Sequence, residues 1–381
     1  MPESIRKAVR PRVAFVLSVT SRVPIGGYKV FYEYANALVA DGFEVQVVHS
    51  FVDRGWPRPF SWRGLTDWGK VCLRSVWHRL RGWQHSPPWF DLDGRVQFRM
   101  VWSLDERHLP SADVYCFSEA AFVARANRYR RIPASRIVHF VQGHETWALP
   151  PAELAELYRS PMKKIAVSDW LRREVEKAGG HATVIPNGFD FNKFRMVTPP
   201  GKRDAHVVGM LFHPAQVKDV ETGFRALELA HARDPGLKVR LFGAFSMDRR
   251  LPPWMTHCHN PTQAQLLDFY NEIAIFLGTS RQEGWGLPVG EAMACGAAVV
   301  CTDNGGYAEM AADGKTARVV PVGDAERMAE ALLELIRDDD LRIRLALAGH
   351  RHISAFTWKR SVRLLEEQLL EICGVDGASH P

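Results

Sequence analysis

The sequence predicts an α/β protein of two domains, each built on a parallel sheet. Its 381 residues are more than one hydrophobic core usually holds. Short apolar segments of strand type alternate with amphipathic segments of helical type, and this series occurs twice along the chain. A stretch containing Pro and Gly, MVTPPGKRD (196–204), separates the two series. We therefore expect an N-terminal Rossmann-like domain over residues 1–195 and a C-terminal one over residues 196–355.

The N-terminal series begins with a βαβ unit. VAFVLSV (13–19) reads as a buried strand, and the turn PIGG (24–27) follows it. Apolar residues then recur at helical spacing over 28–42, where Gly42 ends the predicted helix. FEVQVVHS (43–50) completes the unit as a second strand. Three further strands are predicted at 113–118, 136–142 and 163–168.

The C-terminal series repeats this pattern. Strands are predicted at 206–212, 237–243, 274–280 and 297–302, with helices between them at 220–234, 265–273 and 289–296. Two more helices are predicted at 324–339 and 356–373. The last has Trp358, Val362, Leu365 and Leu369 on one stripe, so that it must pack against another element. We expect it to pack on the N-terminal domain.

The composition excludes several classes of protein. The share of hydrophobic residues is 46% and that of charged residues 24%, which is typical of a globular protein. No run reaches the ~20 apolar residues of a spanning helix, and no cleavage-site pattern follows the first apolar segment. The six cysteines form neither a Cys-x-x-Cys pair nor a zinc pattern. We therefore expect a cytoplasmic protein with reduced thiols and without a resident metal ion or other cofactor.

The segment SRQEGWGLPVGEAMACGAAVV (280–300) places a strand end, a Gly-rich turn and a helix start in succession. Backbone N–H groups and the positive end of a helix dipole at such a junction suit a diphosphate. Glu283 and Glu291 would repel a phosphate, but they fit as acceptors for neutral sugar hydroxyls. Alternatively, Glu291 lies in the first helical turn and only complements the helix dipole, while Glu283 is solvated. The spacing alone favours neither interpretation.

Cations are expected near a diphosphate, and Lys218 follows a predicted strand at the sheet edge where α/β proteins bind ligands. His213 lies five residues before it. Gly26 and Gly27 form a second strand-to-helix turn that could approach a ligand closely. The alternatives are a solvated lysine and glycines that serve only their turn.

His144, in HFVQGHETW, follows the predicted strand 136–142. A histidine at that place could hydrogen-bond a sugar or assist proton transfer. It could equally satisfy a loop carbonyl as a structural residue.

The order of these features resembles the retaining GT-B glycosyltransferases of family four. The resemblance rests on the Gly-Gly turn, His144, VIPNGFD (184–190), Lys218, and EGWGLPVGEAMACGAAVV with DNGGYAEM. The E-x7-E pattern within it is the most specific part. The resemblance implies two Rossmann-like domains facing a central cleft and a nucleoside-diphosphate sugar as donor. It also implies sugar transfer with retention, without a metal ion, to a glycan or lipid-linked glycan in cell-surface polysaccharide synthesis.

The resemblance also implies a role for each candidate residue. His144, Lys218 and Glu283 are the expected catalytic groups, with Glu283 near the sugar hydroxyls, and Glu291 is expected to bind the ribose. The stretch His259–Thr262 is expected to border the base. The expected donor-binding residues are Gly26, Gly27, His213, Lys218, Asn260, Glu283, Gly286, Leu287, Pro288, Val289 and Glu291. Many family members carry Arg where this chain has His213, which implies a different donor or another cation nearby.

Residues 54–90 contain six of the twelve tryptophans and seven basic residues against one acidic residue. Tryptophan and arginine on an amphipathic segment are typical of the headgroup region of an anionic membrane. The basic excess belongs to residues 1–195, which carry 29 Lys and Arg against 19 Asp and Glu. We expect peripheral attachment to the inner face of the cytoplasmic membrane. Packing of these tryptophans on the domain is the main alternative. Nucleic acid is the least favoured, and we expect no nucleic acid partner.

Three other functions fit parts of the pattern. An NAD-dependent dehydrogenase shares the βαβ unit, but the first turn, TSRVPIGGYKV, lacks G-x-G-x-x-G. A sugar-nucleotide epimerase or hydrolase could share the two-domain fold. A binding-only protein would not need Lys218, Glu283 and Glu291 together.

Overall fold

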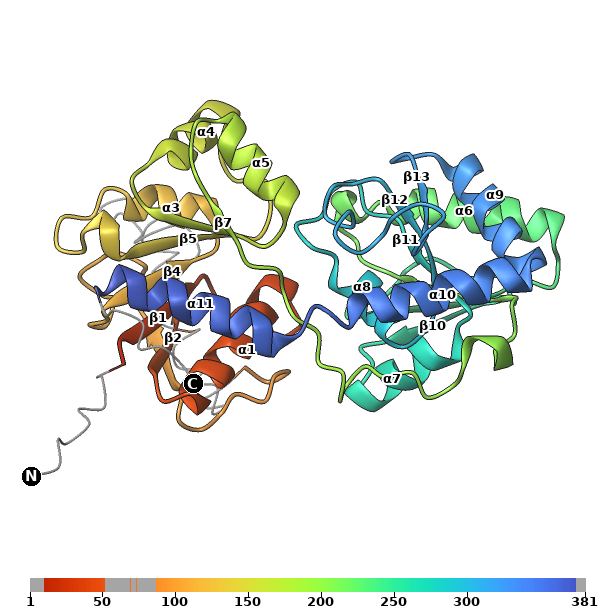
Figure 1. Cartoon of the computed structure of the whole chain (residues 1–381), viewed down its shortest axis with the longest axis horizontal. Coiled ribbons are helices and arrows are strands. Elements are labelled where there is room, and N and C mark those ends of the chain that lie inside the picture. The colour runs from red at the N-terminus through yellow and green to blue at the C-terminus, as the bar shows by residue number, and fades with distance from the viewer. Residues whose placement is uncertain (1–9, 52–68, 70–72, 74–86, 375–381) are drawn as a thin grey trace, which may run out of the picture. The chain divides into compact units, whose positions relative to one another are not determined.

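The computed structural model describes residues 10–51, 69, 73 and 87–374, and it divides the chain into two compact units (Figure 1). The first unit comprises Met1–Val167, Leu171–Ile185 and Lys359–Pro381. The second comprises Ser168–Trp170 and Pro186–Trp358. The division therefore falls earlier than the 195/196 boundary expected from the Pro-rich stretch, and most of VIPNGFD belongs to the second unit.

The first unit is built on a parallel sheet of seven strands in the order β3-β2-β1-β4-β5-β6-β7. Central β1 is buried because its neighbours cover both edges, so that Phe15 pairs with Val47 on one side and with Cys116 on the other. The strands are β1 (Arg12–Leu17), β2 (Glu44–Ser50), β3 (Gln97–Val101), β4 (Val114–Phe117), β5 (Ile137–Val141), β6 (Lys163–Ala166) and β7 (Thr183–Val184). From β1, the chain adds β2 and β3 on one side and then β4 to β7 on the other. The direction in which strands are added therefore reverses between β1 and β4.

Helix α1 (Gly26–Ala40) buries the apolar stripe predicted for it, including Val30, Phe31, Tyr34 and Leu38. Gly26 and Gly27 are its first two residues, whereas the sequence had indicated a turn at both positions. The other helices before residue 186 are α3 (Ala120–Ala126), α4 (Pro151–Arg159) and α5 (Asp169–Lys177).

The last helix, α11 (Trp358–Ile372), returns to the first unit from residue 359 onwards. Val362, Leu365 and Leu369 are buried, as the stripe predicted, and Glu366 pairs with Arg10 at 3.3 Å. Trp358, predicted on the same stripe, is half-buried and belongs to the second unit, and Ser361 is buried beside the other three.

The second unit has a six-stranded parallel sheet in the order β10-β9-β8-β11-β12-β13. Its strands are β8 (Val207–Leu211), β9 (Lys238–Gly243), β10 (Met255–His259), β11 (Ile275–Gly278), β12 (Ala298–Thr302) and β13 (Arg318–Val320). Its helices are α6 (Val220–Arg233), α7 (Gln263–Glu272), α8 (Leu287–Ala294), α9 (Ala325–Arg337) and α10 (Asp339–Ile353). The strand order reverses between β8 and β11.

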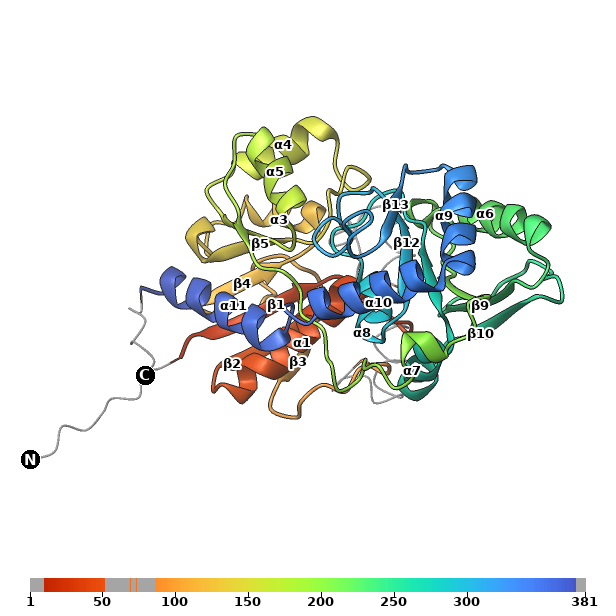
Figure 2. The same cartoon turned by 45° about the vertical axis from the view of Figure 1, so that its right-hand side comes forward.

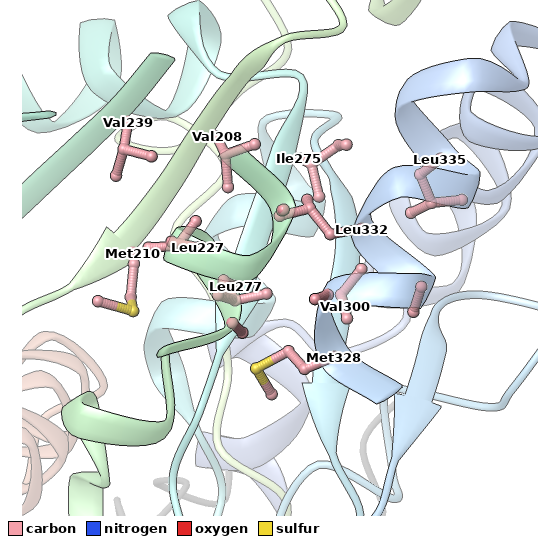
Figure 3. Packing of buried hydrophobic residues seen from close by; sticks show 14 of the residues in the cluster. Val208, Met210, Leu227, Val239, Ile275, Leu277, Val300, Met328, Leu332 and Leu335 are labelled. Carbon is pink, nitrogen blue, oxygen red and sulfur yellow. The ribbon is translucent and has the colours of Figure 1, made fainter. Parts of the chain in front are cut away.

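One hydrophobic core joins this sheet to α6 and α9, which lie side by side (Figure 2). Figure 3 shows Val208, Ile275 and Leu277 of the sheet packing with Leu227 of α6 and Leu332 of α9. All five are at most 1% exposed. Burial of this kind fixes the strands, and the loops at their carboxyl ends are positioned by them.

Candidate functional site

Lys218 and Glu283 lie at the point where the second sheet reverses its strand order. Lys218 ends a short 3-10 turn (Gln216–Lys218) in the segment that follows β8, and Glu283 is in the loop that follows β11. β8 and β11 are adjacent parallel strands, so their carboxyl ends share one edge of the sheet. The reversal point of such a sheet is where α/β proteins bind ligands.

The two side chains form an ion pair: Lys218 Nζ donates to Glu283 Oε1 at 2.6 Å. Ser280 Oγ donates to the same oxygen at 2.7 Å. The side chains of Lys218 and Glu283 are only 24% and 14% exposed. The alternatives of a solvated lysine and a solvated glutamate are therefore wrong.

The backbone on both sides of this pair is held by polar contacts. Thr279 Oγ1 donates to Lys218 O at 2.7 Å, and Arg281 N donates to Val217 O at 2.8 Å. Arg281 also pairs through Nε with Asp219 at 3.0 Å. The loop after β11 thus fixes the turn that carries Lys218. The sequence-based interpretation gave no role to Ser280, Thr279 or Arg281.

The DNGGY stretch (303–307) supports the loop of Glu283 from the other side. Asn304 Nδ2 donates to Ser280 O at 3.1 Å, and its Oδ1 accepts from Tyr307 N. A Cβ atom on Gly306 would lie 2.4 Å from Glu283 O, so only glycine fits there. Tyr307 is buried, and this burial, reinforced by Glu283, holds the pKa of its hydroxyl well above the usual value. The sequence analysis used DNGGYAEM only for the family resemblance and assigned no individual role to Asn304 or Tyr307.

Gly286 precedes helix α8 in the left-handed conformation, with φ 96°. A Cβ atom there would meet the Tyr307 ring at 2.3 Å, so both backbone and space require glycine. Pro288 has no N–H, and Val289 N already donates to Gly286 O at 3.1 Å. Of the four backbone positions that were expected to border the donor here, only Gly286 and Leu287 therefore have an N–H group left for a ligand within the described part of the chain.

Glu291 is the fifth residue of α8, so it lies in the second turn and not in the first. It is 6% exposed, and Tyr270 donates to its Oε2 at 3.1 Å. The interpretation that Glu291 complements the first turn of the helix is therefore wrong. A buried carboxylate with a hydroxyl partner is a fixed hydrogen-bond acceptor.

His213 lies in the segment after β8 that also carries Lys218, and Asn260 directly follows β10. His213 Nδ1 accepts the Ala215 N–H at 3.0 Å, which leaves Nε2 as the protonated nitrogen of a neutral ring. Burial, followed by the charge of Lys218, lowers the pKa of His213 and favours this neutral form. Asn260 has a left-handed backbone, φ 49°, and donates from its N–H to Gly243 O at 2.6 Å.

A small pocket brings part of the predicted set together. Lys218, Glu283 and Pro288 line it, along with Ser280 and Tyr307. Glu291, His213 and Asn260 are not among its lining residues. Gly286, Leu287 and Val289 do not line it either, although they belong to the same unit. The other candidates, Gly26, Gly27 and His144, belong to the first unit.

The start of α1 lies at the reversal point of the first sheet, after β1. Gln142, which follows β5, donates from Nε2 to Gly27 O at 3.2 Å and to Ser118 Oγ at 3.1 Å. A Cβ atom on Gly27 would lie 3.4 Å from Gln142 Oε1, so a larger residue would crowd this contact. Gln142 therefore ties the ends of β4 and β5 to the start of α1, a role that its place in the sequence did not indicate.

His144 follows Gln142 and lies beside Tyr158 of α4, whose hydroxyl is 3.4 Å from His144 Nδ1. The next residue, Glu145, accepts the Ala120 N–H at the start of α3 at 2.8 Å. Burial raises the pKa of Glu145 to about 7. A histidine, a tyrosine and a carboxyl group of perturbed pKa thus lie at the carboxyl edge of the first sheet.

Most of segment 54–90 lies outside the described residues. Within its described end, Trp89 packs on the first unit: its Nε1 donates to Ser21 O at 3.0 Å, and its ring lies 5.5 Å from that of Tyr32. No helix among the described residues is both long and apolar enough to cross a membrane. Among the same residues, no group of three or more His, Cys, Asp or Glu is arranged to hold a metal ion.

Both halves of the chain match domain families of known proteins. Residues 26–193 match the family described as Glycosyltransferase Family 4, and residues 202–338 match Glycosyl transferases group 1. A phosphatidyl-myo-inositol mannosyltransferase of Mycolicibacterium smegmatis is 30% identical over 51% of this chain and 53% of its own length. A D-inositol 3-phosphate glycosyltransferase of Nocardiopsis dassonvillei is 27% identical over 57% and 56%. The chain thus spans about half the length of these curated relatives.

Solved structures share the architecture at low sequence identity. Sucrose-phosphate synthase from Thermosynechococcus elongatus superposes with a TM-score of 0.72 at 16% identity, over 96% of this chain and 100% of that one. Anabaena HepE in complex with UDP and glucose superposes with a TM-score of 0.68 at 16% identity, over 95% and 100%. By the sequence of its two halves and by its two parallel-sheet units, this chain is a glycosyltransferase homologue with the GT-B fold.

Proposed function

We propose that this chain is a hexosyltransferase that moves a sugar from a nucleoside-diphosphate donor to a glycan or lipid-linked glycan acceptor, with retention at the anomeric carbon. The ion pair of Lys218 and Glu283 at the reversal point of the second sheet carries this proposal. Glycosyltransferase relatives, and a structural neighbour in complex with UDP and glucose, support the class of donor.

In the proposed reaction, the bond between the anomeric carbon and the diphosphate oxygen breaks, and a bond to an acceptor oxygen forms on the same face. The nucleoside diphosphate leaves with the bonding electrons, and its freed oxygen takes the proton of the acceptor hydroxyl. Lys218 stabilises the charge that develops on the diphosphate, together with the N–H groups of Gly286 and Leu287. These groups act without a resident metal ion in this proposal.

The remaining groups of the second unit position the donor. Glu283, held by Lys218 and Ser280, accepts hydrogen bonds from sugar hydroxyls. Glu291 accepts from the ribose in the same way, and the segment around Asn260 borders the base. His213 acts as a neutral donor from Nε2, because its Nδ1 is already engaged. A neutral ring contributes less to phosphate binding than a guanidinium.

In the first unit, we assign Gly26 and Gly27 to close approach of backbone to the donor, and His144 to its sugar. Glycines at the start of α1 expose N–H groups that have no partner within the helix. The acceptor would be a component of a cell-surface polysaccharide. Segment 54–90 would attach the enzyme to the anionic inner face of the cytoplasmic membrane, where a lipid-linked acceptor is presented.

The experiment that tests this function has two stages. Thermal shifts with UDP, GDP, TDP and ADP identify the base, since a ligand of the native state raises its unfolding temperature. The matching sugar nucleotides are then incubated with a glycan acceptor, and the product and its anomeric configuration are determined by NMR. Transfer to the acceptor with retention supports the proposal. Release of free sugar, or isomerisation of the donor without transfer, would instead identify a hydrolase or an epimerase.

A further inference from the structure

A second cavity, of about 440 Å³, lies in the first unit between the segment after β3 and the end of α3. Its volume is in the range of small-molecule sites. Four arginines line it (Arg107, Arg125, Arg128 and Arg131), together with Tyr129 and two carboxylates, Asp105 and Glu106. None of these residues belongs to the proposed donor site.

The two walls of this cavity are joined by hydrogen bonds. Tyr129 donates from its hydroxyl to Leu104 O. Glu106 Oε2 accepts the backbone N–H groups of Arg130 and Arg131, both at 2.8 Å. Arg125 pairs with Asp105 at 2.7 Å. Contacts across the cavity therefore hold its shape without a ligand.

Both carboxylates already have hydrogen-bond or ion-pair partners among the residues around the cavity. Asp105 pairs with Arg125 and also accepts from Ser103 Oγ at 2.8 Å. The backbone N–H groups that Glu106 accepts, that of Arg131 first, hold the pKa of its carboxyl below the usual value, so it stays charged. Both acidic groups thus serve to shape the site.

The other three arginines are exposed, and the charge of one of them, Arg131, acts on a carboxylate of the cavity, that of Glu106. Within residues 10–51, 69, 73 and 87–374, the guanidinium groups of Arg107, Arg128 and Arg131 form no ion pair or side-chain hydrogen bond. Three like charges around one concavity repel each other, and an anion placed among them removes that repulsion. Guanidinium groups bind phosphate oxygens through paired N–H donors, which favours a phosphate over a neutral sugar.

We propose that this cavity is a binding site for a phosphate group carried by a small molecule or by a lipid headgroup. It is separate from the donor site and independent of the chemistry proposed there. Arg107, Arg128 and Arg131 bind the phosphate oxygens, and Tyr129 fixes the wall from which two of them project.

Binding to the full chain tests the proposal, in a Lys218→Ala background that removes the lysine of the donor site. R128Q/R131Q is compared with R225Q/R337Q, which removes two exposed arginines of the second unit and changes the net charge equally. The soluble probes are inorganic phosphate and glucose 6-phosphate, followed by calorimetry. The lipid probe is a phosphatidylglycerol vesicle, compared with phosphatidylcholine, followed by co-sedimentation.

We expect R128Q/R131Q to bind the probe roughly tenfold more weakly than the background protein, because this variant loses charge-assisted hydrogen bonds to the phosphate. R225Q/R337Q should bind as the background protein does. Loss with the soluble probes assigns a free phosphate compound, and loss with vesicles alone assigns a lipid headgroup. Equal binding by both pairs of variants, or no binding of any probe by the background protein, overturns the proposal. Calorimetry and co-sedimentation both measure binding alone, so these results do not depend on whether the protein transfers a sugar.

Discussion

Lys218 Nζ and Glu283 Oε1 lie 2.6 Å apart, although 65 residues separate them in the sequence. They meet because they follow adjacent strands, β8 and β11, whose carboxyl ends share one edge of the sheet. In the chain without a donor, each charge compensates the other at low exposure. A bound diphosphate would compete with Glu283 for the lysine, so we expect the two residues to act as a unit in donor binding.

Replacing Lys218 by Ala should reduce turnover by about 10²–10³-fold, because it removes charge stabilisation from the leaving diphosphate. Steady-state kinetics with saturating donor measure this loss, and thermal unfolding checks that the fold is kept. Lys315→Ala, which removes an exposed lysine of the same unit, is the matched control and should stay at wild-type activity. Wild-type turnover of the Lys218 variant would contradict the assignment.

Replacing Glu291 by Ala should weaken binding of the nucleoside diphosphate by about 1–3 kcal/mol, since a ribose hydroxyl loses its acceptor. Calorimetry with the nucleotide measures the effect. Tyr270→Phe separates binding from structure, because it removes the hydroxyl that donates to Glu291 and leaves the carboxylate in place. We expect Tyr270→Phe to retain most of the affinity. If Glu291→Ala binds the nucleotide as wild type does, Glu291 has no role in the donor site.

Replacing His144 by Ala should reduce sugar transfer more than it reduces binding of the free nucleotide, because His144 is assigned to the sugar. Transfer rates and nucleotide affinities are compared for the same variant. Tyr158→Phe removes the hydroxyl near His144 Nδ1 and should change both quantities little. Equal losses of transfer and of nucleotide affinity would identify His144 as a structural residue.

Glu145 should make the protein less stable as the pH rises. Burial raises its folded-state pKa from 4.5 to about 7, so its contribution is most favourable below pH 4.5 and is lost between 4.5 and about 7. Within that window, the free energy of unfolding should fall by up to about 1.4 kcal/mol per pH unit from this group.

Glu145→Gln keeps an acceptor for the Ala120 N–H and removes the titration. Urea unfolding at pH 4.5 and pH 8 should therefore show that this variant is stabilised relative to wild type only at the higher pH. Glu153→Gln, at an exposed position of α4, is the control and should follow wild type. A stability difference between Glu145→Gln and wild type that is independent of pH would refute the prediction.

Segment 54–90 should bind vesicles that contain acidic lipid and release them at high salt, because each basic residue near such a surface contributes about 1 kcal/mol. Co-sedimentation measures this binding. The change of Arg74, Arg79 and Arg81 to Glu should leave the protein in solution. The same change at Arg225, Arg337 and Arg344 is the charge-matched control. If wild type ignores anionic vesicles at low salt, the tryptophans of this segment pack on the protein, as Trp89 does.

The sequence predicted the central strands because they are continuous apolar runs. VAFVLS and AAVVCT can be recognised without any neighbour, since buried parallel strands are apolar on both faces. All four edge strands of the two sheets that the structure describes were missed for the opposite reason, since the short β7 and β13 and the longer β3 and β10 are partly exposed. β3 reads QFRMV and β10 reads MTHCH. Hydrogen bonding to β2 and β9 makes them strands, and that pairing is not a property of their own residues.

The same distinction applies to the candidate site. Lys218 and Glu283 could be selected one by one from their places after predicted strands, but their pairing needed the strand order. Asn304 and Gln142 act through contacts with Ser280 and Gly27, which lie far away in the sequence. Supporting residues of this kind have no local pattern, so a single sequence does not indicate them.

The return of α11 to the first unit affects how the chain can fold during its synthesis. The ribosome releases residues 10–185 long before residues 359–372, yet α11 supplies the buried stripe of Val362, Leu365 and Leu369 to the same unit. The second unit is nearly continuous and is complete by residue 358. The half that is translated first is therefore the last to bury its surface. A nonsense codon at residue 359 would leave a fully formed second unit attached to a first unit that exposes apolar groups to proteases and chaperones.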